Sequence, residues 1–135
     1  MNKAWRLCID FDGVINSYTS GYDPHNHAWL PDPPVPGAKK FLLECIENFE
    51  TVYILSARAQ VLEGVIAIRE WLKKWDLPDL PISFVKYPAN VYLDDRGLRF
   101  DGVFPDIEQM KILSSWVHPK TNNDPYEDPE RREDE

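Results

Sequence analysis

The feature that most restricts the fold of this chain is an apolar run that ends in two closely spaced aspartates. The stretch Leu7–Val14 reads Leu-Cys-Ile-Asp-Phe-Asp-Gly-Val, which is typical of a buried strand that leaves a sheet through a turn. Side chains alternate along a strand, so Asp10 and Asp12 share one face or converge where Gly13 lets the chain turn. Two such anions repel each other unless a cation lies between them, and Mg²⁺ prefers oxygen ligands. The alternative is a strand end with two solvated acids.

The rest of the chain alternates between short apolar, β-branched segments and longer segments with helical periodicity. The predicted strands after the first are 51–55, 81–85, 90–93 and a fifth around 98–104, and the predicted helices are 37–48, 61–75 and 106–116. Strands that alternate with helices indicate a three-layer, Rossmann-like α/β sandwich with a mostly parallel central sheet. In such sheets, ligands bind outside the carboxyl ends of the strands.

Length and charge limit the classes of protein that this chain can belong to. Its 135 residues predict one domain over 1–118, followed by an acidic tail over 119–135 that we expect to be disordered. The net charge is −8 and neither part has a basic excess, which makes broad nucleic-acid binding unfavourable. No long apolar span or signal peptide is evident, and Cys8 and Cys45 lie in apolar segments. We therefore expect a reduced, cytoplasmic protein without a membrane span.

A long polar and aromatic segment follows the two aspartates. Residues 14–36 have no helical period and contain several turn signals, so they predict a loop above the carboxylates. Tyr18, Tyr22 and Trp29 favour a loop that packs on the domain. His25 and His27 have no third nitrogen or sulfur ligand nearby, so we expect them to face solvent or substrate rather than a metal.

Polar residues stand at the end of every predicted strand up to the fourth. They are Asp10 and Asp12, then Ser56, then Lys86, then Asp94 and Asp95. Each has a structural explanation by itself, such as a helix cap for Ser56, a solvated base for Lys86 or a turn for the last pair. Their recurrence at consecutive strand ends favours a single site instead.

This pattern resembles the haloacid dehalogenase superfamily of aspartate-nucleophile phosphatases. The matching motifs are the strand with Asp-x-Asp-Gly at 9–14, the serine at Ser56, the lysine at Lys86 and the acidic pair Asp94-Asp95. The resemblance covers residues 5 to 117 and is most specific in its first motif. It implies the fold of that superfamily. The intervals between the motifs leave no room for a cap domain, so a capless member is implied.

The resemblance also implies a role for each residue of the motifs. Asp10 would attack phosphorus and form an aspartyl-phosphate, and Asp12 would protonate the leaving oxygen and then activate water. Mg²⁺ would be held by Asp10, the backbone carbonyl of Asp12, and Asp94, with Asp95 as a ligand or directly behind one. The remaining implied contacts are Ser56 to a phosphoryl oxygen, Lys86 to the shared negative charge, and Gly13, Ala57 and Arg58 to substrate. Arg58 and Arg96 lie beside the motifs, where each is a candidate substrate contact with a structural ion pair as the alternative.

These inferences together predict a Mg²⁺-dependent phosphatase that hydrolyses a phosphate monoester. The substrate is a phosphorylated small molecule or the phosphorylated end of a macromolecule, because a capless site stays open. One alternative is a nucleic-acid end phosphatase. Another is a catalytically idle scaffold that binds a partner through its loop and tail. The sequence does not indicate an oligomeric state.

Overall fold

The structure is a computed structural model that describes residues 4–113 of the chain. Its elements are β1 (Arg6–Asp10), α1 (Ala38–Asn48), β2 (Thr51–Leu55), the 3-10 helix η1 (Ala57–Gln60), α2 (Leu62–Lys74), β3 (Ile82–Ser83), β4 (Val91–Leu93) and α3 (Ile107–Leu113). The predicted acidic tail and the end of the predicted last helix lie outside the described residues. None of the described helices has the length and apolar character that a membrane span requires.

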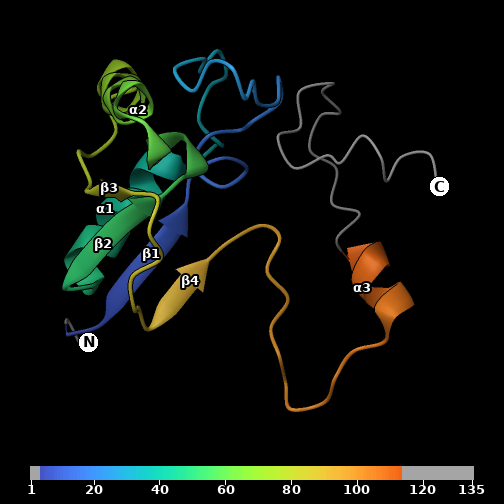
Figure 1. Ribbon diagram of the computed structural model, residues 1–135. Coiled ribbons are helices and arrows are strands. Elements are labelled where there is room, and N and C mark those ends of the chain that lie inside the picture. The colour runs from blue at the N-terminus through green and yellow to red at the C-terminus, as the bar shows by residue number, and fades with distance from the viewer. Residues whose placement is uncertain (1–3, 114–135) are drawn as a thin grey trace.

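The four strands form one parallel sheet in the order β3-β2-β1-β4. The chain moves outward from β1 to β3 and then returns to the other side of β1 for β4. The strand order therefore reverses between β1 and β4, which is where α/β sheets of this kind bind ligands. Figure 1 shows β1, β2 and β4 pointing the same way, with the loop after β1 beyond their carboxyl ends. The predicted α/β fold with a mostly parallel sheet is confirmed.

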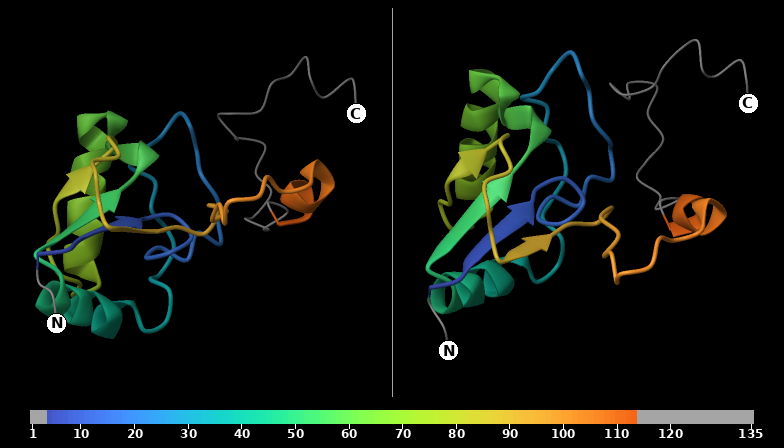
Figure 2. Two further views of the ribbon diagram at one scale, coloured as in Figure 1. Left: turned by 90° about the horizontal axis from the view of Figure 1, so that it is seen from below. Right: turned by 60° about the horizontal axis from the view of Figure 1, so that its bottom comes forward.

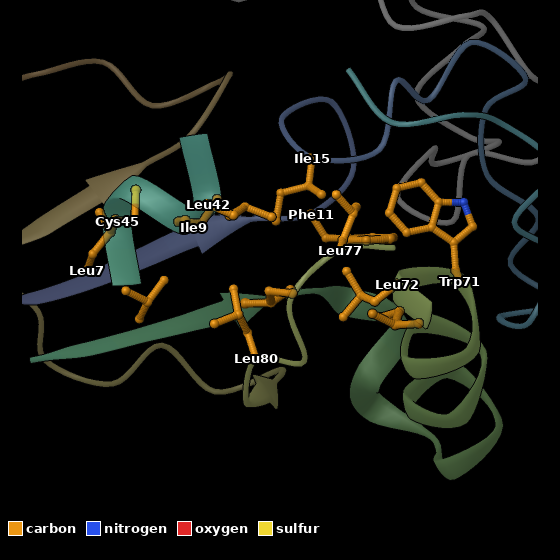
Figure 3. Close-up of a cluster of buried hydrophobic side chains, with 13 residues drawn as sticks. Leu7, Ile9, Phe11, Ile15, Leu42, Cys45, Trp71, Leu72, Leu77 and Leu80 are labelled. Carbon is orange, nitrogen blue, oxygen red and sulfur yellow. The ribbon is translucent and has the colours of Figure 1, made fainter. Parts of the chain in front are cut away.

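One sheet face and two helices build the hydrophobic core. The core residues include Leu7 and Ile9 of β1, Val52 and Ile54 of β2, Leu42 and Cys45 of α1, and Ile68, Trp71 and Leu72 of α2 (Figure 3). Both cysteines are buried and free, as expected. Helix α3 lies apart from the sheet in all views (Figures 1 and 2). Within the described residues, α1 and α2 therefore pack in one shared core, and α3 does not cover the other face of the sheet. The three-layer arrangement remains a prediction.

Two predicted strands differ from the structure for local reasons. Strand β3 covers only two residues of the predicted 81–85, because the Ser83 hydroxyl accepts the N–H of Val85 at 2.9 Å and turns the chain away from β2. Residues 98–104 form no strand within the described part of the chain. There the carboxyl of Asp101 accepts the N–H of Val103 at 3.1 Å, and Gly102 has a φ of 104°. The prediction of a fifth strand is therefore wrong.

The loop over 14–36 is fixed to the domain by one buried acid. The Ser20 hydroxyl and N–H donate to the two oxygens of Asp32 at 2.6 and 2.7 Å, and the Asp32 carbonyl accepts the indole N–H of Trp71 at 2.9 Å. Tyr18 and Tyr22 are buried. The predicted packed loop is confirmed for these residues, and Trp29 is more exposed.

Asp32→Asn is expected to destabilise the protein by about 1–3 kcal/mol, because a charged acceptor of two hydrogen bonds is lost. Burial alone would raise the pKa of Asp32, but the hydrogen bonds from Ser20 hold it below its ordinary value. The stabilisation is therefore present above the ordinary pKa of the carboxyl and is lost as the pH falls through its lowered value. Urea denaturation at neutral and acidic pH measures both effects. Asp101→Asn, at an exposed turn, is the control and should unfold like the wild type.

Candidate functional site

Three carboxylates meet at the point where the strand order reverses. Asp10 ends β1, and Asp94 and Asp95 directly follow β4. In the register of these neighbouring strands Ile9 lies beside Leu93, so Asp10 and Asp94 occupy the next position on adjacent strands. Each of the three acids offers one oxygen, and these oxygens all lie within 4.8 Å of one another. We refer to Asp10, Asp94 and Asp95 as the acid cluster.

The acid cluster has negative charge that the described residues do not neutralise. Burial, together with the carboxyls of Asp95, Asp94 and Asp12, raises the pKa of Asp10 to about 8. Both carboxylate oxygens of Asp95 are buried, and apart from a hydrogen bond shared with the protonated form of Asp10 they have no partner within residues 4–113. Since a buried carboxylate needs more than this contact when Asp10 is ionised, these oxygens fit a bound cation. A hard divalent ion such as Mg²⁺ suits a set of carboxylate oxygens.

The side chain of Asp94 is partly engaged in its own turn. Its Oδ1 accepts the backbone N–H of Arg96 at 2.5 Å and that of Gly97 at 3.0 Å. This is the turn that the sequence offered as the structural explanation of the acidic pair. The same arrangement holds the carboxylate toward Asp10, so the turn orients one member of the acid cluster.

Asp12 points to a different set of partners. Gly13, with a φ of 87°, turns the chain after β1, and its N–H is bonded to the carbonyl of Asn16 at 2.8 Å. The Asp12 carboxylate accepts the Arg58 Nε–H at 2.9 and 3.2 Å and the Asn16 amide at 2.8 Å. Its carboxylate therefore lies outside the acid cluster. Only its backbone carbonyl is left for the implied role as a metal ligand, and the Gly13 N–H is already used within the turn.

Arg58 is fully buried, at 0% exposure. Besides Asp12, its guanidinium donates to the carbonyl of Trp29 at 2.8 Å and to that of His27 at 3.4 Å, and it lies 5.0 Å from the centre of the Tyr22 ring. The expectation that Arg58 contacts substrate is corrected by this burial. The structural ion pair, which the sequence left open as the alternative, is what the structure contains.

Ser56 lies at the carboxyl end of β2 and caps η1. Its hydroxyl oxygen accepts the backbone N–H of Arg58 at 3.1 Å, and its own N–H donates to the carbonyl of Ser83 at 2.9 Å. The cap uses the oxygen as an acceptor and leaves the hydroxyl proton for another acceptor. Ala57, the next residue, is exposed at the start of η1.

Lys86 shares a sheet face with the acid cluster without an ion pair to it. Its ammonium lies 4.3 Å from the centre of the Tyr92 ring. Tyr92 pairs with Cys8 in the register of β4 and β1, and Asp94 and Asp10 follow two residues later on the same face. The described residues include no ion pair between Lys86 and these carboxylates. Its ammonium therefore lies beside Tyr92, two residues before Asp94 in the chain.

Sequence reasoning gave no role to Asn16, which is 1% exposed and bonded to Asp12. In the sequence, Asn16 is only an amide four residues after an aspartate. The tight turn at Gly13 brings this amide next to the Asp12 carboxylate. Within residues 4–113, His27 does not belong to a group of side chains placed to bind a metal ion. Instead its Nδ1 lies 2.6 Å from the hydroxyl of Tyr22, within the loop.

The site thus combines an acid cluster at the strand ends with a separate aspartate that is held by Arg58 and Asn16. Ser56 stands at the neighbouring strand end, and Lys86 lies further down the same sheet. Comparison with known proteins does not add to this picture, because no protein-family model, no curated protein and no solved structure matches the chain.

Proposed function

We propose that this chain is a Mg²⁺-dependent phosphohydrolase of the haloacid dehalogenase type, which cleaves a phosphate monoester through an aspartyl-phosphate. The observation that carries the proposal is the acid cluster at the reversal of strand order, with two buried carboxylate oxygens on Asp95. A second carboxylate, Asp12, lies two residues from Asp10 but is oriented by Arg58 and Asn16. Two neighbouring carboxylates in different surroundings suit two different chemical roles.

Asp10 is the nucleophile in this proposal. Its carboxylate oxygen attacks phosphorus, the bond from phosphorus to the leaving oxygen breaks, and the phosphoryl group is transferred to Asp10. Asp12 takes up a proton when the phosphate ester binds, gives this proton to the leaving oxygen, and then accepts a proton from the water that hydrolyses the aspartyl-phosphate. Mg²⁺ held by Asp10, Asp94 and Asp95 would supply the positive charge that lets a carboxylate approach an anionic phosphate. It would also favour the ionised form of Asp10, whose pKa is otherwise raised.

Two further residues have supporting roles. Ser56 is fixed at the end of β2 by its backbone bond to Ser83, and its hydroxyl proton suits a phosphoryl oxygen. Lys86 extends along the sheet face that carries Asp10, so rotation of its side chain away from Tyr92 brings its charge toward the phosphate. Positive charge at that position stabilises the negative charge that the nucleophile and the phosphate share.

The proposal includes the three-layer, capless architecture of the superfamily, with the loop over 14–36 as the cover of the site. The strand order with β1 beside β4 and the anchoring of the loop by Asp32 support it. An open site of this kind favours a phosphorylated group on a larger molecule, or a small phosphate ester that the loop contacts. The buried free cysteines favour a reducing, cytoplasmic compartment.

The test is turnover of a panel of phosphate monoesters by the full chain, with Mg²⁺ and with excess chelator. The panel contains aryl phosphates, sugar phosphates, a phosphoserine peptide and an oligonucleotide with a terminal phosphate. We expect phosphate release that requires Mg²⁺ and is absent from Asp10→Asn. Calorimetric titration with Mg²⁺ is the parallel measurement. Absence of both turnover and Mg²⁺ binding would contradict the proposal and favour the idle scaffold.

A further inference from the structure

We infer that Arg58 is a positioning residue that fixes the carboxylate of Asp12 and the loop segment 22–29 as one unit. The inference rests on the proposed function, because it concerns the carboxyl group that protonates the leaving oxygen. It also changes the expected role of the loop, which becomes a fixed wall of the site on the side of Asp12.

The guanidinium of Arg58 contacts both Asp12 and the far side of the loop over 14–36. Its Nε–H points to both oxygens of Asp12, at 2.9 and 3.2 Å. Another guanidinium nitrogen, Nη1, donates to the loop carbonyls of Trp29 and His27 at 2.8 and 3.4 Å. Arginine presents its donors in a rigid planar fork, so the direction of one contact fixes the direction of the other. A displacement of the loop at these carbonyls is therefore transmitted to the carboxylate.

The backbone that carries Arg58 is itself held in place. Ser56 caps its N–H at 3.1 Å, and Gly64 of α2 packs against its carbonyl so closely that a Cβ on Gly64 would lie 1.8 Å from that oxygen. The Tyr22 ring covers the guanidinium at 5.0 Å. Since Arg58 is excluded from solvent, it does not bind substrate directly. It acts through Asp12.

The burial of Arg58 makes its ion pair with Asp12 important for stability. A buried guanidinium stays ionised and needs a nearby anion, and the Asp12 carboxylate is the only anion that forms an ion pair with it within residues 4–113. The Asp12 side chain keeps 18% of its surface exposed, so Arg58 covers one part of the carboxyl group and leaves another part accessible. Small misplacements of a proton-transfer group reduce the rate strongly. The position of the guanidinium therefore decides how well Asp12 meets the leaving oxygen.

The test compares two substrates that differ in their need for a proton on the leaving oxygen. p-Nitrophenolate leaves readily without one, whereas phenolate depends on it. In Arg58→Lys and in Arg58→Gln, we expect kcat/KM for phenyl phosphate to fall about 10–100-fold further than kcat/KM for p-nitrophenyl phosphate. The ratio is taken on one protein preparation, so a reduced folded fraction cancels. Arg69→Lys, which alters an exposed ion pair on α2, should leave the ratio unchanged.

A double-variant cycle provides the second readout. If Arg58 acts through Asp12, Arg58→Lys adds less than about threefold to the loss in an Asp12→Asn background, because interacting residues are not additive. Equal losses with both substrates, or additive losses in the cycle, overturn the inference and leave the proposed function standing. A wild type that releases no phosphate from any ester overturns both.

Discussion

Asp10→Asn is expected to lower phosphate release by at least about 10⁴-fold, because an amide cannot form the acyl-phosphate bond. The same substitution should make the metal-free protein more stable. Asp10 faces two other carboxylates of the acid cluster, so the wild-type protein must take up a proton at Asp10 when it folds at neutral pH, whereas the asparagine is neutral without one. We expect an increase in Tm of about 5 °C or more without metal. Thermal unfolding in chelator, alongside the turnover assay, measures both effects.

The stability effect should depend on pH in a defined direction. The pKa of Asp10 is raised from 3.8 to about 8, so between these values the folded protein holds a proton that the unfolded chain releases. The stability from this group is complete below pH 3.8 and is lost as the pH rises through about 8. The variant lacks this dependence, so its advantage over the wild type should grow from pH 4 to pH 8.

Mg²⁺ provides the matched control, since it should stabilise the wild type far more than the variant. Equal pH slopes of stability for the two metal-free proteins would contradict the electrostatic account of the acid cluster. Equal stabilisation of both proteins by Mg²⁺ would contradict Asp10 as a ligand.

The parts of the fold that depend on local sequence were predictable. Strand β2 has the predicted bounds, Thr51–Leu55, and α1 and α2 begin and end within a few residues of the predictions. Hydrophobic periodicity determines these elements, because each buries a continuous apolar face. The prediction of a fifth strand was wrong because periodicity was its only support. Apolar residues alternate over 98–104, but Asp101 and Gly102 turn the backbone there. A strand also requires a partner edge, and periodicity does not supply one.

The site was predictable as a set of strand ends but not as a set of contacts. Parallel strands bring Asp10 and Asp94 together once the strand order is known, so the acid cluster follows from topology. The pairing of Asp12 with Arg58 joins residues 46 positions apart, and no spacing rule connects them. The sequence also left open which of Asp94 and Asp95 faces a metal. The structure brings oxygens of both into the acid cluster, with those of Asp95 the less engaged.

Asp12→Asn is expected to reduce kcat by about 10²–10⁴-fold, since the leaving oxygen loses its proton donor. Its effect on stability should be opposite to that of Asp10→Asn. The Arg58 side chain is 0% exposed in the wild type, and in this variant its only ion-pair partner within residues 4–113 becomes a neutral amide. Removal of one partner of a buried ion pair costs about 3 kcal/mol or more. Urea denaturation of the metal-free protein measures this loss.

The control for Asp12→Asn is Asp79→Asn, which breaks the exposed ion pair with Arg69 and should cost about 0–1 kcal/mol. If Asp12→Asn unfolds at the same urea concentration as the wild type, Arg58 does not depend on this carboxylate. Two aspartates that lie two residues apart should therefore change stability in opposite directions. Opposite signs arise only if one carboxylate faces other acids while the other faces a cation. A shared position between two acids would make both asparagine variants more stable, so the pair of measurements tests the orientation of Asp12 independently of any substrate.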